Sequence, residues 1–238
     1  MHTDSRNFYD SYVLRQGGAD DEDRILAMLQ MIPDSTKSVL DVGCTEGRNL
    51  RVFRRKLPQA RLCGTDVGES MAETLRQQGF EFYPTGADQE SPFPDESFDV
   101  ITCGEVIEHV FDPDKMLTDF HRILKRSGTL IITTPNLAYL PNRLLLAFGI
   151  QPLFTETSLL KNYGRLHPIL GEGNPAQGHL RIFTLRALLE LLRDHKFDIL
   201  TVKGYRWLHR GIPGKIDKLI SIRPSFAAGF IVAAERNR

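Results

Sequence analysis

The stretch SVLDVGCTEGRNL at residues 38–50 limits what this chain can fold into more than any other feature. A short apolar run ends in Asp41, and Gly43 and Gly47 follow with G-x-x-x-G spacing before a helical pattern begins. This order predicts a strand, a tight turn and a helix. Glycines let the backbone of such a turn approach a ligand, and the helix N-terminus presents free N–H groups to it. The expected ligand is a nucleoside-like cofactor.

The spacing of the glycines separates two kinds of cofactor. A strand followed by G-x-G-x-x-G is typical of dinucleotide binding. Here Thr45 replaces the second glycine, and Glu46 adds a carboxylate where a pyrophosphate needs neutral or positive surroundings. The segment resembles the first motif of class I S-adenosylmethionine-dependent methyltransferases, whose cofactor carries an ammonium and a sulfonium group and tolerates nearby acids. The resemblance implies S-adenosylmethionine as cofactor, with contacts from Asp41, Gly43, Cys44 and Gly47.

Polar residues follow the next two predicted strands at positions that the rest of such a cofactor needs. Asp66 lies in the strand at 61–67, about 20 residues after the glycine turn, where an acid can accept both ribose hydroxyls. The third strand, at 81–85, leads into a loop at 86–89. In similar enzymes an acid in this loop meets the adenine amine, which only donates, and Asp88 matches it. The resemblance also assigns to the cofactor site Val67, Gln89, Gly104 and Glu105.

Strands and helices alternate over most of the chain, and the near-continuous apolar strands are typical of parallel strands covered on both faces. With the phrase PFPDESFDVITCGEVIEHV, the resemblance covers residues 38–135. It implies one α/β domain over 1–238, with a Rossmann-like, seven-stranded, mostly parallel sheet, helices on both faces, and the last strand antiparallel beside the fifth. The expected strands are 38–42, 61–67, 81–85, 98–103, 129–133, 197–204 and 229–234, and the expected helices are 20–32, 50–57, 70–78, 112–128 and 184–196.

An insertion after the fifth strand breaks the alternation. Residues 137–178 contain an apolar run at 144–150, several prolines and a glycine-rich end. Irregular segments of this length are usually lids or binding elements, so we expect an inserted lid over the acceptor side. A contact with a second copy or with a membrane surface is the alternative, because the apolar run is too short to span a bilayer. The basic stretch at 209–226 is expected to be loop-like.

The chemistry implied by the resemblance is an in-line attack of an acceptor atom on the sulfonium methyl group. The protein must align donor and acceptor, and must remove a proton if the acceptor is a hydroxyl. His109 and His179 are the candidate catalytic bases, although each has an alternative interpretation as a packing or capping residue. We expect O-methylation of a small-molecule or glycan-like hydroxyl acceptor, without a metal ion.

A metal-assisted reaction is the second hypothesis for the same residues. Glu105, Glu108, His109 and His179 offer oxygen and nitrogen ligands to a divalent ion, which would acidify acceptor hydroxyls. This pattern resembles that of small-RNA 3′-end 2′-O-methyltransferases, and a related cluster is seen in ubiquinone-biosynthesis O-methyltransferases. A nucleotide-sugar or NAD enzyme on the same fold would need a tighter glycine motif. A non-catalytic cofactor-binding module is a further alternative.

The composition limits which partners and which cellular compartment we expect for the protein. Lys+Arg and Asp+Glu both number 30, so no general field attracts phosphate backbones, and a nucleic-acid partner is not expected. Cys44, Cys63 and Cys103 form no C-x-x-C pair and are predicted to be buried, reduced thiols. The first residues lack the pattern of a signal peptide, and no transmembrane segment is expected. We therefore expect a cytoplasmic protein, with a homo-oligomer as an open possibility.

Overall fold

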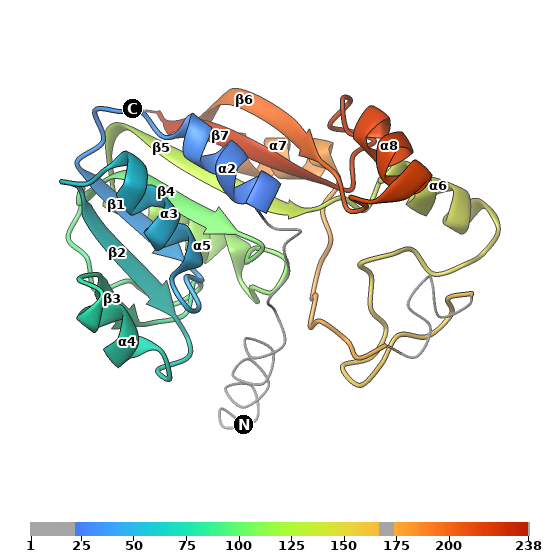
Figure 1. Ribbon diagram of the computed structural model, residues 1–238, viewed down its shortest axis with the longest axis horizontal. Helices are drawn as coiled ribbons and strands as arrows, with labels where there is room; N and C mark the ends of the chain where they lie inside the picture. Colours follow the sequence, from blue (N-terminus) through green and yellow to red (C-terminus); the bar gives the residue numbers. More distant parts are fainter. Residues whose placement is uncertain (1–21, 167–173, 238) are drawn as a thin grey trace.

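Seven strands form a sheet in the computed structural model of the protein, which describes residues 22–166 and 174–237 (Figure 1). The strands are β1 (Ser38–Val42), β2 (Arg61–Asp66), β3 (Glu81–Pro84), β4 (Phe98–Gly104), β5 (Leu124–Pro135), β6 (Phe197–Tyr205) and β7 (Gly229–Arg236). Their order is β3-β2-β1-β4-β5-β7-β6. Strands β1 to β5 pair in parallel, and β7 pairs antiparallel with β5 and β6. The predicted fold class is confirmed.

Helices cover both faces of this sheet. They are α2 (Glu22–Met31), α3 (Arg48–Lys56), α4 (Ala72–Gln77), α5 (Pro113–Ile123), α6 (Leu140–Ala147), α7 (Leu185–Asp194) and α8 (Gly211–Ile220). Apolar residues of α5 and α7 belong to one buried cluster, and those of α2, α3 and α4 belong to a second cluster. The sheet lies between α2 and α3 on one face and α5 and α7 on the other, as Figure 1 shows. This layering explains why the strands are apolar on both faces.

The chain order places a ligand site at one edge of the sheet. The strands run outward from β1 to β3 in one direction, and from β4 onward in the other. In open α/β sheets, ligands bind outside the carboxyl ends of the strands at such a switch point. The glycine turn follows β1, and the segment that contains His109 follows β4. Both predicted halves of the site therefore lie at the same end of the sheet.

Two helices begin with a side-chain cap. The side chain of Asp112 accepts a hydrogen bond from the backbone N–H of Lys115 (3.0 Å), and Pro113 occupies the first turn of α5. Thr184 caps α7 in the same way, through the N–H of Ala187 (3.3 Å). The expected helix end at 124–128 is wrong, because Leu124 already pairs with Phe98 as part of β5.

Two helices occupy stretches that were expected to be irregular. Helix α6 lies inside the insertion at 137–178, and Asn142 is its buried residue. Helix α8 lies in the stretch expected to be loop-like, and it buries Gly214 and Asp217. Apolar residues recur at helical spacing in α8, at Ile212, Ile216 and Leu219, but neither helix buries an apolar stripe against the core. Tertiary contacts of buried polar residues hold these helices in place, and the sequence pattern does not show them.

Helices α6 and α8 pack around a small satellite core. Its buried residues are Tyr139, Leu153 and Ala228, and Leu145 of α6 and Ile220 of α8 pack against them. Both helices lie at the end of the sheet that is farthest from β3 and α4 (Figure 1). No helix in the described part of the chain has the length and apolar character that crossing a membrane requires.

Candidate cofactor and acceptor site

The turn after β1 needs both of its glycines. Gly43 and Gly47 have φ angles of 71° and 77°, a region that side-chain-bearing residues rarely adopt. A Cβ on Gly43 would lie 2.4 Å from Cγ2 of Val106, and one on Gly47 would lie 2.3 Å from Cδ2 of Leu75. The N–H of Gly43 donates to the carbonyl of Thr65 (2.8 Å), which ties the turn to β2. The predicted strand, tight turn and helix are confirmed.

Asp41 is fully buried near the carboxyl end of β1. Its Oδ1 accepts hydrogen bonds from Thr102 Oγ1 (2.7 Å) and Asn49 Nδ2 (3.2 Å). Its Oδ2 has no hydrogen-bond partner within the described ranges. Burial raises the pKa of Asp41 from 3.8 to about 6, against the lowering effect of the two donors. A buried carboxylate oxygen without a donor suits a cationic ligand at this turn.

Asp66 holds the glycine turn from the neighbouring strand. Its Oδ2 accepts from the N–H of Thr45 (2.9 Å), and its Oδ1 accepts from the N–H of Gly68 (3.0 Å). Asp66 therefore has a structural role, because it holds the backbone of two turns in place. Each carboxylate oxygen has a second lone pair. The half-buried Asp66 can thus support the turn and accept from ligand hydroxyls at once.

The residues expected at the adenine end gather around the loop after β3. A Cβ on Gly86 would lie 3.3 Å from Val67, 3.5 Å from Asp88 Oδ1 and 3.5 Å from Gln89. The side chain of Gln89 accepts from the N–H of Gly86 (3.2 Å), so it shapes the loop itself. Asp88 Oδ2 accepts from the N–H of Phe111 (3.3 Å), which connects this loop to the segment after β4.

The side chain of Cys44 belongs to the core. It is 2% exposed, and burial raises the pKa of its thiol. A Cβ on Gly64 would lie 2.5 Å from its Sγ, so β2 packs closely against it. The side chain of Cys44 is therefore not available to a ligand. All three cysteines are buried and free of disulfides, as predicted.

The carboxyl end of β4 carries a polar network. Glu105 has a φ of 57°, and its Oε1 accepts from Thr133 Oγ1 (2.7 Å) and from the hydroxyl of Tyr205 (2.9 Å). Arg24 of α2 donates to the same Thr133 (3.3 Å). A Cβ on Gly104 would lie 2.8 Å from Nη1 of Arg24, so this glycine leaves space for the guanidinium.

The sequence reasoning missed Arg24 and Tyr205. Arg24 stands among the acidic residues that begin a helix, and Tyr205 ends a strand at the opposite end of the chain. Tyr205 reaches Glu105 because Gly229 leaves space for its ring: a Cβ there would lie 2.1 Å from the tyrosine oxygen. A glycine at the start of a buried strand is a weak signal, and it does not indicate which residue fills the space.

The two candidate bases meet at this end of the sheet. The ring centroids of His109 and His179 lie 4.9 Å apart. Nδ1 of His109 lies 3.1 Å from the carbonyl oxygen of Gly178, and Nδ1 of His179 lies 2.7 Å from that of Phe154. A carbonyl oxygen only accepts, so each Nδ1 carries a hydrogen, and in the neutral form of either ring the lone pair is on Nε2. Burial and the neighbouring imidazole lower the pKa of His109 from 6.5 to about 4, so it is neutral at pH 7.

Glu108 completes a group of possible metal ligands with the two imidazoles. The ligand atoms of Glu108, His109 and His179 all lie within 4.8 Å of one another. Glu108 is fully buried, its Oε2 accepts from Thr134 Oγ1 (2.9 Å), and its Oε1 has no hydrogen-bond partner in the part of the chain that the structure describes. Burial, together with the charge of Glu105, raises the pKa of Glu108. Glu105 itself does not belong to this group.

The insertion holds the second histidine. Glu156 accepts from three consecutive backbone N–H groups, those of Gln177 (2.6 Å), Gly178 (2.7 Å) and His179 (3.2 Å). The next two residues, Leu180 and Arg181, donate their N–H groups to the carbonyl of Glu108. The middle of the insertion is thereby attached to its C-terminal end, and the residues that follow are attached to the segment after β4.

Comparison with known proteins decides the family. Residues 9–202 match the family of methyltransferase domains. The chain belongs to this family. The resemblance to S-adenosylmethionine-dependent methyltransferases is confirmed, and S-adenosylmethionine is the cofactor of the class. The matched range includes the turn after β1, with its acid and both glycines.

Relatives of this methyltransferase agree on the fold and leave the acceptor open. The ubiquinone biosynthesis O-methyltransferase of Hahella chejuensis is 34% identical over 106 residues, 42% of this chain and 44% of that protein. The chain spans less than two thirds of the curated relatives that it matches. A chain from the complex between the Trm112 methyltransferase activator of Haloferax volcanii and a proposed methyltransferase has a TM-score of 0.67 at 18% identity, covering 98% of this chain and 97% of that one. The Burkholderia thailandensis 1,6-didemethyltoxoflavin-N1-methyltransferase, solved with S-adenosylhomocysteine, has a TM-score of 0.61 at 15% identity, covering 98% and 84%.

Proposed function

We propose that this protein transfers the methyl group of S-adenosylmethionine to a hydroxyl oxygen of a small-molecule or glycan-like acceptor. The observation that carries the proposal is the pair His109 and His179, whose Nδ1–H groups are held by backbone carbonyls. His109 lies in the segment after β4, and β4 pairs with β1, the strand that leads into the glycine turn. An acceptor hydroxyl that donates to Nε2 gives up its proton there while its oxygen attacks the methyl carbon. The sulfonium then leaves as a neutral thioether.

The cofactor assignments form part of the proposal. Asp66 accepts from the ribose hydroxyls, and Asp88 accepts from the adenine amine. Asp41, with a buried oxygen that has no donor among described residues, faces the positively charged part of the cofactor. The guanidinium of Arg24, above Gly104, suits the cofactor's carboxylate. Calorimetry with S-adenosylmethionine and S-adenosylhomocysteine tests these roles, and preferential binding of NAD would contradict them.

Activity tests the two histidines directly. Isotope-labelled S-adenosylmethionine, offered with a panel of hydroxyl-bearing acceptors, should label an oxygen. His109→Ala and His179→Ala should each lower kcat about 10²-fold to 10⁴-fold. His121→Ala is the matched control, because His121 packs against Phe197 away from the site. Full activity in the double histidine variant would show that alignment alone supplies the catalysis, and cofactor binding without turnover on any acceptor would favour the non-catalytic module.

The metal-assisted reaction remains the second candidate, because Glu108, His109 and His179 fit a divalent ion. One carboxylate and two imidazoles suit such an ion, and the Nδ1–H contacts to backbone carbonyls are those that orient metal-binding histidines. A bound ion would lower the pKa of an acceptor hydroxyl. If this reaction operates, EDTA abolishes turnover, Mn²⁺ or Mg²⁺ restores it, and Glu108→Gln weakens Mn²⁺ binding in a direct titration. Turnover that survives EDTA supports the metal-free route, which we favour.

RNA ends are the alternative acceptor of the metal-assisted route, and an RNA oligonucleotide with a free 3′ end tests it in the same assay. The balanced charge of 30 basic and 30 acidic residues supports a small acceptor over RNA. The three buried thiols without disulfides support action in the reducing cytoplasm. We also propose that the lid expected at 137–178, of which 167–173 lie outside the described residues, covers the acceptor, because Phe154 and Gly178 supply the carbonyls that hold the two histidines.

A further inference from the structure

Helix α8 turns its apolar side outward. Its buried residues are Gly214 and Asp217, whereas Ile212, Ile216 and Leu219 are 74%, 54% and 69% exposed. A helix on the surface of a globular protein normally does the opposite and buries its apolar stripe against the core. At 100° per residue the three apolar side chains share one face, directly opposite the two buried residues. Ile222, just beyond the helix, is 72% exposed as well.

Buried polar contacts hold α8 in this orientation. The carboxylate of Asp217 accepts from the hydroxyl of Tyr139 (2.8 Å) and from the N–H groups of Trp207 (2.8 Å) and Leu208 (2.7 Å). A Cβ on Gly214 would lie 2.7 Å from the carbonyl carbon of His209, so only glycine allows this close packing. The outward apolar face therefore follows from specific contacts on the inner face.

The charged residues of 203–223 are nearly all basic, and one of them, Arg206, pairs with Asp23 of α2 (2.7 Å). Residues 203–223 contain six Lys or Arg residues and a single acid, the buried Asp217, although the whole chain is neutral. Lys215 and Lys218 lie along one flank of the apolar face, and neither forms an ion pair with any residue in the described ranges. An exposed apolar stripe beside a basic stripe is the pattern of helices that lie in the interface of an anionic membrane.

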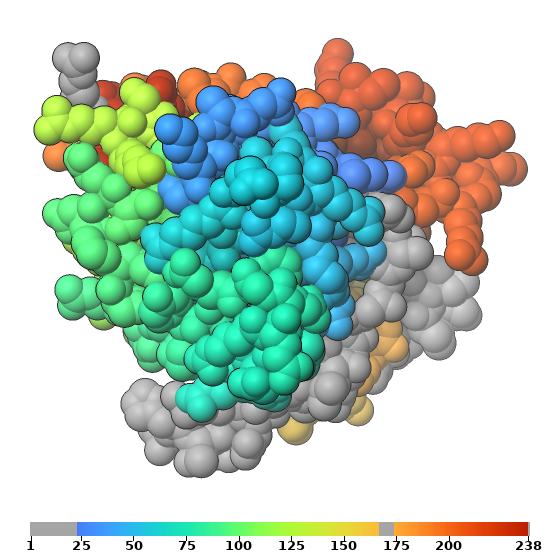
Figure 2. All heavy atoms as spheres, turned by 60° about the vertical axis from the view of Figure 1, so that its left-hand side comes forward, coloured from blue at the N-terminus to red at the C-terminus, as the bar shows by residue number. Residues whose placement is uncertain are grey.

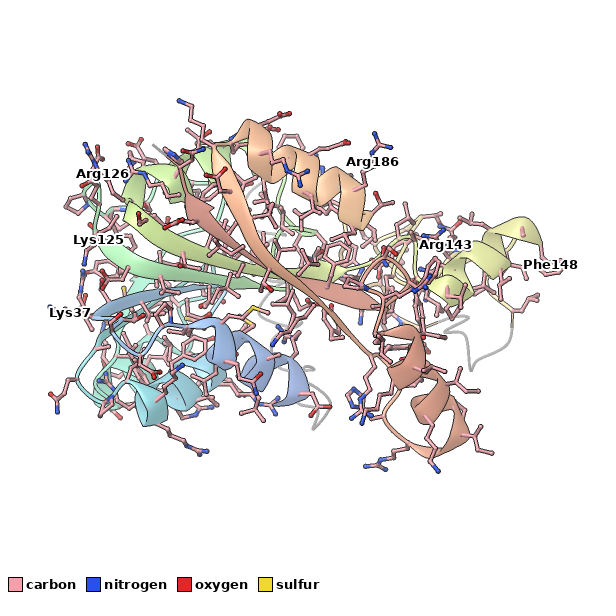
Figure 3. The ribbon with its side chains drawn as sticks, turned by 90° about the horizontal axis from the view of Figure 1, so that it is seen from above. Lys37, Lys125, Arg126, Arg143, Phe148 and Arg186 are labelled. Carbon is pink, nitrogen blue, oxygen red and sulfur yellow. The ribbon has the colours of Figure 1, made fainter. Side chains whose placement is uncertain are left out.

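The position of α8 leaves it accessible. Figure 2 shows it protruding from the body of the molecule, and Figure 3 shows α6 at the same end, with Phe148 at its outer tip. Phe148 is 79% exposed, and Trp207, which precedes α8, is 42% exposed. Aromatic side chains of this kind favour the boundary between headgroups and acyl chains.

We propose that α8 binds the protein reversibly to the surface of an anionic lipid bilayer. Ile212, Ile216 and Leu219 enter the interface, and Lys215 and Lys218 contact the lipid phosphates. The helix lies on the bilayer and does not cross it. A second copy is a poorer occupant of this face, because pairing two copies would bring the two lysine stripes together without an exposed acid in 203–223 to offset them. The proposal does not depend on the acceptor or on catalysis.

Trp207 makes the binding directly measurable. It is the only tryptophan of the chain, so its fluorescence reports on this end of the molecule alone. We expect a blue shift and reduced acrylamide quenching when vesicles of phosphatidylcholine with about one third phosphatidylglycerol are added to the full chain. Vesicles of phosphatidylcholine alone should bind much more weakly. Raising salt from about 0.1 M to about 1 M, where the Debye length falls from about 10 Å to about 3 Å, should weaken the binding.

Two double variants, each with a matched control, distinguish the contribution of charge to vesicle binding from that of apolar contact in a flotation assay. Each cation near an anionic surface contributes about fivefold in affinity, so Lys215→Glu with Lys218→Glu should weaken binding at least about 25-fold. Arg55→Glu with Arg76→Glu changes net charge equally on α3 and α4 and should have little effect. Ile216→Ser with Leu219→Ser should weaken binding about tenfold or more. Leu200→Ser, on the exposed side of β6, is the matched apolar control.

All these side chains are exposed, so the variants should fold, and thermal unfolding checks this. Failure of the folded wild-type chain to bind anionic vesicles would overturn the proposal. So would binding that is equal in the α8 variants and in the controls. If the wild-type chain does not bind vesicles but sediments as a dimer, and Ile216→Ser with Leu219→Ser makes this dimer dissociate, the face belongs to a contact with a second copy. RNA binding that is lost when Lys215 and Lys218 are replaced, in a protein that does not bind vesicles, would also contradict the membrane proposal.

Discussion

Replacing Asp41 by asparagine should change how the stability of the protein depends on pH. Burial raises the pKa of this carboxyl group to about 6, whereas its ordinary value is 3.8. Between these two pH values the folded protein keeps a proton on Asp41 that the unfolded chain has released. The free energy of unfolding therefore falls as pH rises across this interval. The stability contributed by the protonated group is complete below pH 3.8 and is lost as pH rises through about 6.

The magnitude follows from the difference between the two pKa values. At 1.36 kcal/mol per pH unit, the ionised wild type is destabilised by about 3 kcal/mol above pH 7. Asparagine has nearly the same shape, keeps the oxygen that accepts from Thr102 and Asn49, and never ionises. Its buried amide adds a loss of about 1 to 3 kcal/mol that does not depend on pH. The informative quantity is therefore the change with pH. Relative to wild type, Asp41→Asn should gain about 2 to 3 kcal/mol between pH 4 and pH 8.

Urea unfolding followed by far-UV circular dichroism at several pH values measures this difference without a cofactor. Thr102→Val provides an internal check, because it removes a hydrogen bond that lowers the pKa of Asp41. In that variant the loss of stability should extend to higher pH. A difference between wild type and Asp41→Asn that stays constant from pH 4 to pH 8 would refute the reasoning, since Asp41 would then ionise normally despite its burial.

Three further predictions concern the site. Gly43→Ala should abolish cofactor binding and destabilise the fold, because its φ is 71° and its Cβ would meet Val106. Adding Val106→Ala to this variant should restore part of the stability in a melting assay but not the binding, since the strained φ remains. Asp66→Ala should weaken S-adenosylhomocysteine binding by about 1 to 3 kcal/mol in calorimetry, and unchanged affinity in the folded variant would remove the ribose assignment. Hydrogen exchange in residues 137–178 should slow when cofactor and acceptor bind. Exchange that is already slow and does not change when either ligand binds would contradict the proposal that this segment is a lid.

Local chemistry made the first half of the site predictable from the sequence. Apolar runs, a G-x-x-x-G turn and a capped proline start act within a few residues, so β1, the glycine turn and α5 were recognisable without a fold. The parallel sheet then had to bring Asp41, Asp66 and Asp88 to the same end, because parallel strands place their carboxyl ends together. The sequence also predicts that His109 and His179 act together, but it does not define the shape of the insertion that brings their rings to 4.9 Å.

Tertiary structure decided everything that depends on contacts between distant segments. Arg24 and Tyr205 reach the end of β4 because Gly104 and Gly229 leave space there, which no local pattern records. The hydrogen positions on the two histidines depend on carbonyl oxygens of Phe154 and Gly178 in the insertion. The expectation of a loop at 209–226 overlooked the helical spacing of Ile212, Ile216 and Leu219, but the orientation of α8 depends on distant contacts. Its buried side carries a glycine and an aspartate whose partners lie in other segments, so its inverted orientation exists only once those segments have packed together.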